Sequence, residues 1–209
     1  AELEARVGGL AQTSKMPCPS WSISAKRCHT GSKLATVKGS ICEGCYALKG
    51  AYSWSNTQTA LERRWEAYSA DPEAWAMNMA DIITRKKLDF FRWFDSGDVQ
   101  SVEMLGKIVK VARLVPFCKF WLPTKELKIV SDWLRLGNKI PKNLVIRLSA
   151  FKRNAKAGKV AGYSLPSSTV TDKTEPIGYP CPSREQGNKC GDCRACWEPS
   201  VRVVSYYWH

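Results

Sequence analysis

The sequence predicts an α/β fold, either a partial (β/α) barrel or an open parallel sheet, in a single domain spanning residues 1–209. Short apolar runs alternate with helical patterns between residues 57 and 150, and such alternation is typical of parallel crossover units. A length of 209 residues is enough to bury one hydrophobic core without disulfide support. An irregular cysteine-bearing N-terminal loop precedes these units, and a cysteine-bearing C-terminal tail follows them.

Changes in composition divide the chain into four regions. Residues 16–56 are rich in Gly, Ser, Cys and Lys without sustained periodicity, which predicts a cysteine loop region. Residues 57–150 hold the βα units. Residues 151–180 are rich in Gly, Ser, Thr, Pro and Lys, which predicts a linker or lid, and residues 181–209 form the cysteine tail with a last strand.

Hydrophobic spacing and turn residues predict the elements in order. Leu61, Trp65 and Tyr68 lie near one helical face, and the pair Asp71-Pro72 ends this helix and begins another. The expected elements are a helix over 57–70, a helix from 72 to about 86, a strand over 88–94, a helix over 99–114, a strand over 118–122, a helix over 124–136, and strands over 144–148 and 201–208.

The balance of charges indicates a class of partner. The formal net charge is +13 and the isoelectric point about 9.4, which favours a polyanion such as nucleic acid, or a host protein, as partner. The N-terminal residues show no basic stretch followed by an apolar one, and no apolar run approaches the length of a membrane span. We therefore expect a cytoplasmic protein that does not contact the membrane.

The tail carries the more specific cysteine pattern. Cys190, Cys193 and Cys196 are separated by two residues each, and Cys181 precedes them. The same two-residue intervals bind a 4Fe-4S cluster in bacterial ferredoxins, with one further cysteine from elsewhere in the sequence. We predict a cluster on these four cysteines, with a four-cysteine zinc site as the alternative.

The front cysteines have looser intervals. Cys42 and Cys45 flank a glycine and form a good metal knuckle, Cys28 lies in a Gly/Ser-rich loop, and Cys18 completes a front group of four. Spacing alone does not decide between an iron-sulfur cluster and zinc here. Cys118 stands alone in an apolar run, which predicts an inert buried cysteine.

Polar residues follow two of the predicted strands, where α/β folds place their ligands. Asp95, Ser96, Gly97 and Asp98 come directly after the strand over 88–94, and Lys125 follows the strand over 118–122. The carboxylates suit an amine or a ribose, and Lys125 suits an anion. The same residues also fit a structural role as helix caps.

Five segments in order carry a family resemblance: SKMPCPSWSISA, CEGCYALKGAY, FRWFDSGDVQ, LPTKE and CGDCRACW. Together they resemble the phage gene-product-eighty-eight family of uncharacterised bacteriophage proteins over residues 14–208. The CYA element with upstream cysteines is distantly similar to radical S-adenosylmethionine enzymes, whose partial barrels hold a cluster near the mouth. Those enzymes separate three cysteines by three and two residues, whereas the intervals from Cys28 through Cys42 to Cys45 are thirteen and two.

Three functions remain open at this stage. The first is a phage protein that binds one or two 4Fe-4S clusters and serves electron transfer, or contacts nucleic acid or a host protein through its basic surface. The second is a radical S-adenosylmethionine-like enzyme with an open iron at Cys28, Cys42 and Cys45, Cys18 being spare. The third is a zinc-binding protein associated with nucleic acid.

Overall fold

A computed structural model describes residues 2–172 and 175–208 of the chain. The α-helices are α1 (Glu2–Ala5), α2 (Thr30–Ala35), α3 (Ser55–Ala70), α4 (Pro72–Arg85), α5 (Val102–Leu114) and α6 (Leu127–Arg135). The strands are β1 (Ser20–Trp21), β2 (Phe90–Trp93), β3 (Lys119–Thr124), β4 (Leu144–Ser149), β5 (Ser167–Thr171), β6 (Tyr179–Pro180) and β7 (Val203–Tyr207). Short 3-10 helices are η1 (Ala25–Arg27), η2 (Tyr46–Leu48), η3 (Gly50–Ser53), η4 (Pro182–Arg184) and η5 (Ala195–Trp197).

The described strands form one open parallel sheet. Their order is β1-β2-β3-β4-β5-β7-β6, and all neighbouring strands are parallel. The α/β prediction is confirmed, in the form of an open parallel sheet, since β1 and β6 are edges and the sheet does not close into a barrel.

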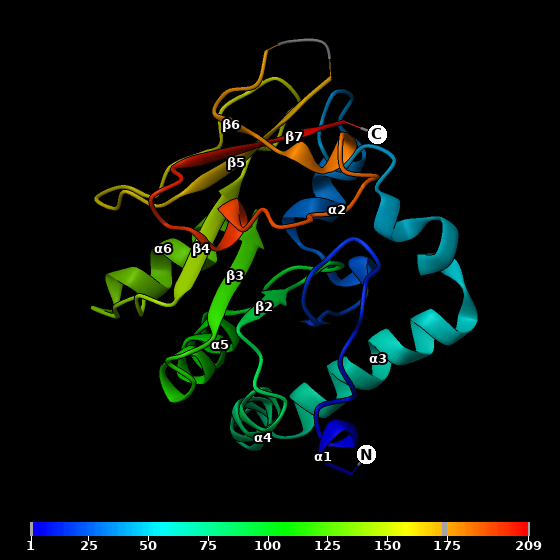
Figure 1. Ribbon diagram of the computed structural model, residues 1–209, viewed down its shortest axis with the longest axis vertical. Coiled ribbons are helices and arrows are strands. Elements are labelled where there is room, and N and C mark those ends of the chain that lie inside the picture. The colour runs from blue at the N-terminus through cyan, green and yellow to red at the C-terminus, as the bar shows by residue number, and fades with distance from the viewer. Residues whose placement is uncertain (1, 173–174, 209) are drawn as a thin grey trace.

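The two faces of the sheet are covered differently (Figure 1). Phe91 and Trp93 of β2 point into the main core, which includes buried side chains of α4, α5 and α6. Phe90 of β2 and Trp121 of β3 pack on the other face against Trp197 of η5 in the tail. The tail therefore replaces helices as the cover of one sheet face.

The predicted helices and central strands are present with shifted boundaries. The helix expected from residue 99 begins at Val102, because the hydroxyl of Ser101 accepts a hydrogen bond from the Met104 N–H and caps it. The helix expected from residue 124 begins at Leu127, because Thr124 still pairs with Leu148 as the last residue of β3. Asp71 caps α4 as expected, accepting from the N–H groups of Glu73 and Ala74.

Two regions predicted as irregular contain strands. Residues 151–180, predicted as a linker or lid, include β5, which lies between β4 and β7. Residues 16–56, predicted as loop, include β1, the edge strand beside β2. Both strands were missed because β1 has only two residues and β5, with the sequence SSTVT, lacks an apolar run.

No helix in the described part of the chain is long and apolar enough to cross a lipid bilayer.

Candidate functional site

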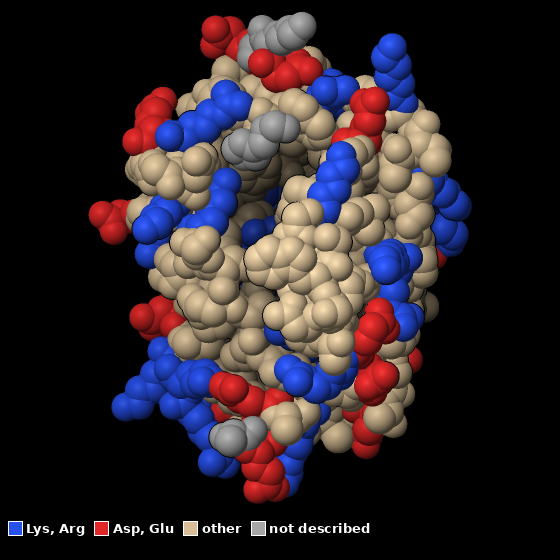
Figure 2. All heavy atoms as spheres, turned by 90° about the vertical axis from the view of Figure 1, so that its right-hand side faces the viewer, with Lys and Arg blue, Asp and Glu red and all other residues tan. Residues whose placement is uncertain are grey.

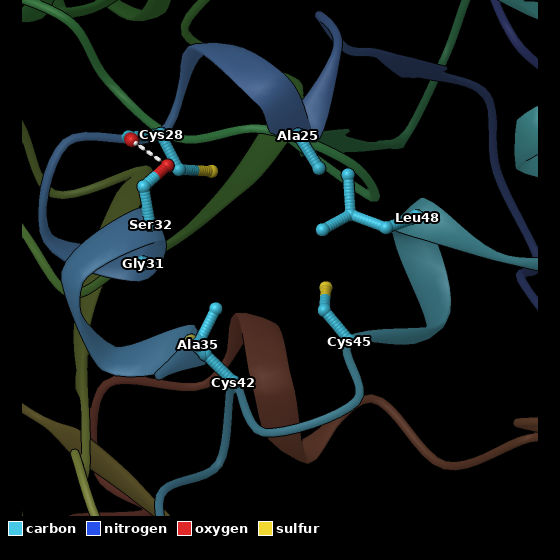
Figure 3. Close-up of a pocket in the computed structure, with 8 residues that line it drawn as sticks. All are labelled: Ala25, Cys28, Gly31, Ser32, Ala35, Cys42, Cys45 and Leu48. Carbon is cyan, nitrogen blue, oxygen red and sulfur yellow. Dashed lines mark hydrogen bonds between the residues drawn. The ribbon is translucent and has the colours of Figure 1, made fainter. Parts of the chain in front are cut away.

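Three cysteines surround one pocket at the carboxyl ends of the strands. Cys28, Cys42 and Cys45 line it together with Ala25, Gly31, Ser32, Ala35 and Leu48. Figure 3 shows the sulfur atoms of Cys28 and Cys45 pointing into this pocket. Burial raises the pKa of Cys28 to about 12, with a contribution from the charge of Asp98. We name Cys28, Cys42 and Cys45 the front group.

Local backbone geometry brings the front group together. Cys28 follows η1, which the hydroxyl of Ser24 caps, and α2 then turns the chain back toward Cys42. A Cβ atom on Gly31 would lie 3.5 Å from the sulfur of Cys28 and 3.7 Å from that of Cys42, so glycine leaves room for both sulfurs. Gly44 adopts φ +64° between Cys42 and Cys45, which closes the knuckle.

Cys18 lies with the tail cysteines, and its assignment to the front group was wrong. The buried Cys18 packs with Met16, Trp121 and Cys196, and Cys190 is an electrostatic neighbour of its thiol. The reason is topological, because β1 lies between Cys18 and Cys28. Cys18 lies before this strand and Cys28 after it, so the two residues join different groups although only nine residues separate them.

The four predicted tail ligands do come together. Cys181, Cys190 and Cys193 are half-buried around the apolar cluster of Cys196 and Trp197, and we name the four tail cysteines the tail group. Cys196 is buried, its sulfur lies 3.1 Å from the Tyr206 hydroxyl, and burial raises its pKa to about 12. The electrostatic neighbours of Cys190 include Cys181 and Cys193 but no front cysteine. The protein thus has two separate cysteine groups.

Three buried N–H donors without acceptors surround the tail group. In the described part of the chain, Nε of Arg92, Nε of Arg147 and Nε1 of Trp121 are buried and make no hydrogen bond. The Arg92 guanidinium lies 4.6 Å from the centroid of the Trp121 ring and interacts electrostatically with Cys18, Cys190 and Cys196. Buried donors without partners are costly. Arg27, Trp75 and Trp93 hold others elsewhere, and the three beside the tail group suit an acceptor at that place.

Arg147 attaches the tail loop, residues 195–201, to the sheet. Its side chain is fully buried in β4 and donates to the carbonyl oxygens of Ser167, Ala195, Cys196, Glu198 and Val201. No carboxylate in the described residues forms an ion pair with it, and burial lowers the pKa of its guanidinium. A buried positive charge without a carboxylate favours an anionic occupant nearby.

Asp95 is a structural carboxylate beneath the front group. Its Oδ1 accepts from the hydroxyls of Ser20 (2.8 Å) and Ser22, and its Oδ2 accepts from Tyr52 (2.5 Å). The backbone carbonyl of Asp95 accepts from the hydroxyl of Tyr46, the residue after Cys45. Both carboxylate oxygens are therefore engaged within the chain, and these contacts fix the segment that carries Cys45.

Replacing Asp95 by asparagine is expected to destabilise the protein by about 2–4 kcal/mol at pH 7, since hydroxyl donors would lose a buried anion. Burial raises the pKa of Asp95, but the Arg92 guanidinium and the hydroxyls of Ser20, Ser22 and Tyr52 outweigh it and hold the pKa below its ordinary value. The carboxylate thus stabilises the fold above pH 4, and this contribution is lost as the pH falls through its lowered pKa.

Urea unfolding of both proteins between pH 3 and pH 7 measures this difference in stability. We expect the difference to shrink below about pH 4, where Asp95 becomes protonated first in the unfolded chain and then, at lower pH, in the folded protein. A difference that stays constant down to pH 3 would contradict the assignment of Asp95 as a buried anion.

Asp98 and Lys125 lie beside the front group. Asp98 is buried, and its carboxylate accepts from the Lys125 N–H (2.9 Å) and the Thr124 hydroxyl (2.6 Å). Burial raises the pKa of Asp98 to about 6. Both Asp98 and Lys125 are electrostatic neighbours of Cys28 and Cys42, so the polar residues expected at the strand ends do meet the front cysteines.

Gly97 and Ser96 complete this turn. Gly97 adopts φ +77°, and a Cβ atom there would lie 2.5 Å from Cγ1 of Ile23 and 2.8 Å from its carbonyl oxygen. Glycine is therefore needed for packing against the end of β1. The Ser96 hydroxyl is buried without a hydrogen-bond partner. Whether Asp95, Ser96, Gly97, Asp98 and Lys125 bind a cofactor stays a prediction.

The cysteines form no disulfides within the described part of the chain. All nine, each within the described residues, are outside disulfides, and Cys118 is buried in the main core as expected. No three His, Cys, Asp or Glu side chains of residues 2–172 and 175–208 are close enough to hold one metal ion. A mononuclear zinc site is thus not preformed in this arrangement.

The predicted site residues did not include several contributors to the two sites, namely Arg92, Arg147, Trp121, Tyr46, Tyr52, Tyr206 and Glu126. Arg92 and Arg147 had a readable signal, because each is a charge inside a strand whose neighbours are apolar. Glu126 is buried and accepts from the N–H and hydroxyl of Thr30, which attaches α2 to the end of β3. Nothing in the sequence indicates that pairing.

The chain matches the model of a known protein family. A family model described as Gene product 88 matches residues 3–199. Neither a curated protein nor a solved structure matches the chain. The distant similarity to radical S-adenosylmethionine enzymes therefore stays a prediction.

Proposed function

The chain belongs to the Gene product 88 family of bacteriophage proteins, and we propose that it is an iron-sulfur protein with two separate cluster sites. The observation that carries this proposal is the set of buried N–H donors without acceptors around the tail group: Nε of Arg92, Nε of Arg147 and Nε1 of Trp121. A 4Fe-4S cluster with four thiolates is anionic and carries sulfur acceptors on every side. It would give these donors partners and balance the buried guanidinium of Arg147, which has no carboxylate of the described residues beside it.

The tail site would have a closed ligand set. Cys181, Cys190, Cys193 and Cys196 would each supply one thiolate, and Cys18 is a fifth thiol nearby. Trp121, Trp197 and Phe90 shield this site from one side. Complete thiolate ligation inside an apolar shell favours electron transfer, because such clusters change charge by one electron without exchanging ligands.

The front site would have an open ligand set. Cys28, Cys42 and Cys45 are the only cysteines at its pocket in the described residues, because Cys18 lies elsewhere. Three thiolates leave one iron of a cubane cluster without a protein ligand. A cluster of this kind supplies a low-potential electron and a Lewis-acidic iron to whatever binds at the pocket.

A radical S-adenosylmethionine-like enzyme is the second candidate, and the three-cysteine pocket favours it. Asp98 and Lys125 lie beside these cysteines, where a carboxylate could receive an amino group and an ammonium could receive a carboxylate. A zinc protein associated with nucleic acid is the third candidate.

Anaerobic purification with iron, sulfide and zinc analysis tests the proposal. We expect about eight iron and eight labile sulfide per chain, with Mössbauer spectra of cubane clusters. Stoichiometric zinc without labile sulfide would overturn it. Adding S-adenosylmethionine to the reduced protein separates the first two candidates, because an altered paramagnetic signal of the front cluster favours the enzyme. Reduced thiols throughout the chain suit a cytoplasmic location in an infected cell.

Replacing Trp121 by phenylalanine is expected to lower the reduction potential of the tail cluster. The indole N–H would donate to a cluster or cysteine sulfur, and such a bond stabilises the more negative, reduced state. A hydrogen bond worth about 1 kcal/mol corresponds to roughly 40 mV for one electron. Potentiometric titration followed by electron paramagnetic resonance measures the shift.

Trp93 provides the matched control for this substitution. Its indole N–H is also buried without an acceptor, but Trp93 lies in the main core on the helix-covered face. The change Trp93→Phe should leave the potential unaltered. Equal shifts in both variants would indicate a general effect of packing instead of a hydrogen bond to the cluster.

A further inference from the structure

The segments around the front group carry exposed lysines that form no ion pairs. Lys26 is in η1, Lys33 in α2, Lys38 follows α2, and Lys49 lies between η2 and η3. Lys152 follows β4, and its backbone pairs with Ser40 in the same region. We name these five residues the lysine rim. In the described part of the chain no carboxylate lies within ion-pairing distance of any of them.

The acidic residues of the same region are already engaged. Glu43 pairs with Arg153 and accepts from the Gly39 N–H, and Glu62 pairs with Arg27. Glu126 and Asp98 are buried and accept hydrogen bonds from the chain. The lysine rim therefore has no internal counter-charge, which leaves a positive potential over the front pocket.

Exposed aromatic rings accompany the lysines. Tyr46 and Trp54 are each 62 % exposed, and both follow the Cys42–Cys45 knuckle by no more than nine residues. The Tyr46 hydroxyl donates to the Asp95 carbonyl, which holds the ring in a fixed orientation above the end of β2. Exposed aromatic side chains that gather in one place, unlike scattered ones, mark a contact surface.

Figure 2 looks onto the side of the molecule where α3 lies in Figure 1, and it shows a hollow there. Lys and Arg side chains lie on both sides of the hollow and also in its depth, whereas the acidic side chains are farther out. An extended anionic ligand that enters this hollow would meet positive charge along its course.

From this combination we propose that the lysine rim, with Tyr46 and Trp54, binds single-stranded nucleic acid, so that the front site acts on or senses a nucleic-acid strand. Lysines contact the phosphates, and aromatic rings stack on bases whose faces are free, as in other single-strand sites. A duplex hides those faces, and an acidic protein would not need the aromatic rings. The assignment of a substrate class rests on the proposed iron-sulfur function, whereas the binding itself does not.

Fluorescence anisotropy of a labelled single strand of about 20 nucleotides with the holoprotein tests this inference. The double change Lys33→Glu and Lys49→Glu should weaken binding at least tenfold and reduce the slope of log affinity against log salt by about 1.4, at about 0.7 for each phosphate contact. Trp54→Ala should weaken binding about tenfold by loss of one stacked base. A duplex of equal length should bind more weakly than the single strand.

Matched controls lie at the opposite end of the sheet. Lys87 precedes β2 and Lys139 precedes β4, both are exposed, and their joint change to Glu alters the net charge equally. Phe117, 52 % exposed before β3, is the control for Trp54. These variants should bind within about twofold of the parent protein. Equal losses in control and test variants, or equal competition by polyglutamate at the same charge, would overturn the proposal.

Iron and sulfide analysis of every variant separates this inference from the proposed function. The variants of Lys33, Lys49 and Trp54 should retain the iron content of the parent protein, since none of these residues is a ligand. Strand binding by a protein that lacks iron would leave the nucleic-acid site intact and refute the clusters. Full iron content without selective strand binding would support the clusters and refute the nucleic-acid site.

Discussion

Replacing Cys193 by serine is expected to halve the iron content of the protein, from about eight to about four atoms per chain. Serine is nearly isosteric, but its hydroxyl is a poor ligand for iron. Cys193 is half-buried near the Tyr179 hydroxyl, so the change opens no cavity in the core. Iron and sulfide analysis after anaerobic purification measures the loss, and the absorbance of the clusters should fall in parallel.

The matching change at the front site is Cys45→Ser, which should also remove about four iron atoms and spare the tail cluster. Loss of all iron from either variant would show that both groups hold one shared cluster, and unchanged iron would remove the substituted residue from the ligand set. Cys118→Ala is the control. Cys118 is buried in the main core and belongs to neither group of predicted ligands, so the iron content of this variant should stay at the parent value.

The iron content expected of these variants depends on which cysteines Cys18 lies beside. With Cys18 at the front, both groups would hold four cysteines, and neither would leave an iron open. Cys18 instead lies before the two-residue strand β1, beside the tail group, and this leaves three cysteines at the front pocket. A strand of two residues has too little pattern to be recognised from sequence, so the assignment of one ligand required the fold.

Much of the fold could be predicted because its central elements have clear periodicity. The apolar run of β4 and the capped start of α4 leave few alternatives, and the predicted boundaries agree within a few residues. The pattern fails at β5, where small hydroxyl residues replace apolar ones. There the buried Thr169 and Ser205 join β5 to β7 through a hydrogen bond between their hydroxyls, an arrangement that depends on tertiary contacts.

The candidate site was only partly predictable for a similar reason. Ligand spacing is local in sequence, so the tail group could be identified directly from its intervals. The residues that support it come from distant strands: Arg92 from β2, Trp121 from β3, Arg147 from β4 and Tyr206 from β7. Their roles follow from the order of strands in the sheet. Sequence alone shows them only as charges and rings in otherwise ordinary strands.

Replacing Arg147 by methionine is expected to destabilise the protein by about 3–5 kcal/mol, because it removes a buried hydrogen-bonded charge. The carbonyl oxygens of Ala195, Cys196 and Val201 would lose a shared donor in a place that water does not reach. The tail loop would then lose its attachment to β4, and iron at the tail site should fall with it. Urea unfolding and iron analysis measure the two effects.

Arg202→Met is the control, because Arg202 is exposed and donates to Ser164 at the surface, so its loss should cost less than about 1 kcal/mol. Comparison of iron-loaded and iron-free protein then separates two roles of Arg147. If Arg147 only attaches the tail loop to β4, the substitution lowers the free energy of unfolding equally in the iron-loaded and iron-free forms. If its unpaired charge also balances an anionic cluster, the cost is larger in the loaded form, because in the iron-free form the buried guanidinium has no counter-charge and contributes less to stability. Equal losses of stability in the two forms would show that the charge of Arg147 does not balance a cluster. Its hydrogen bonds would then be its whole contribution to stability.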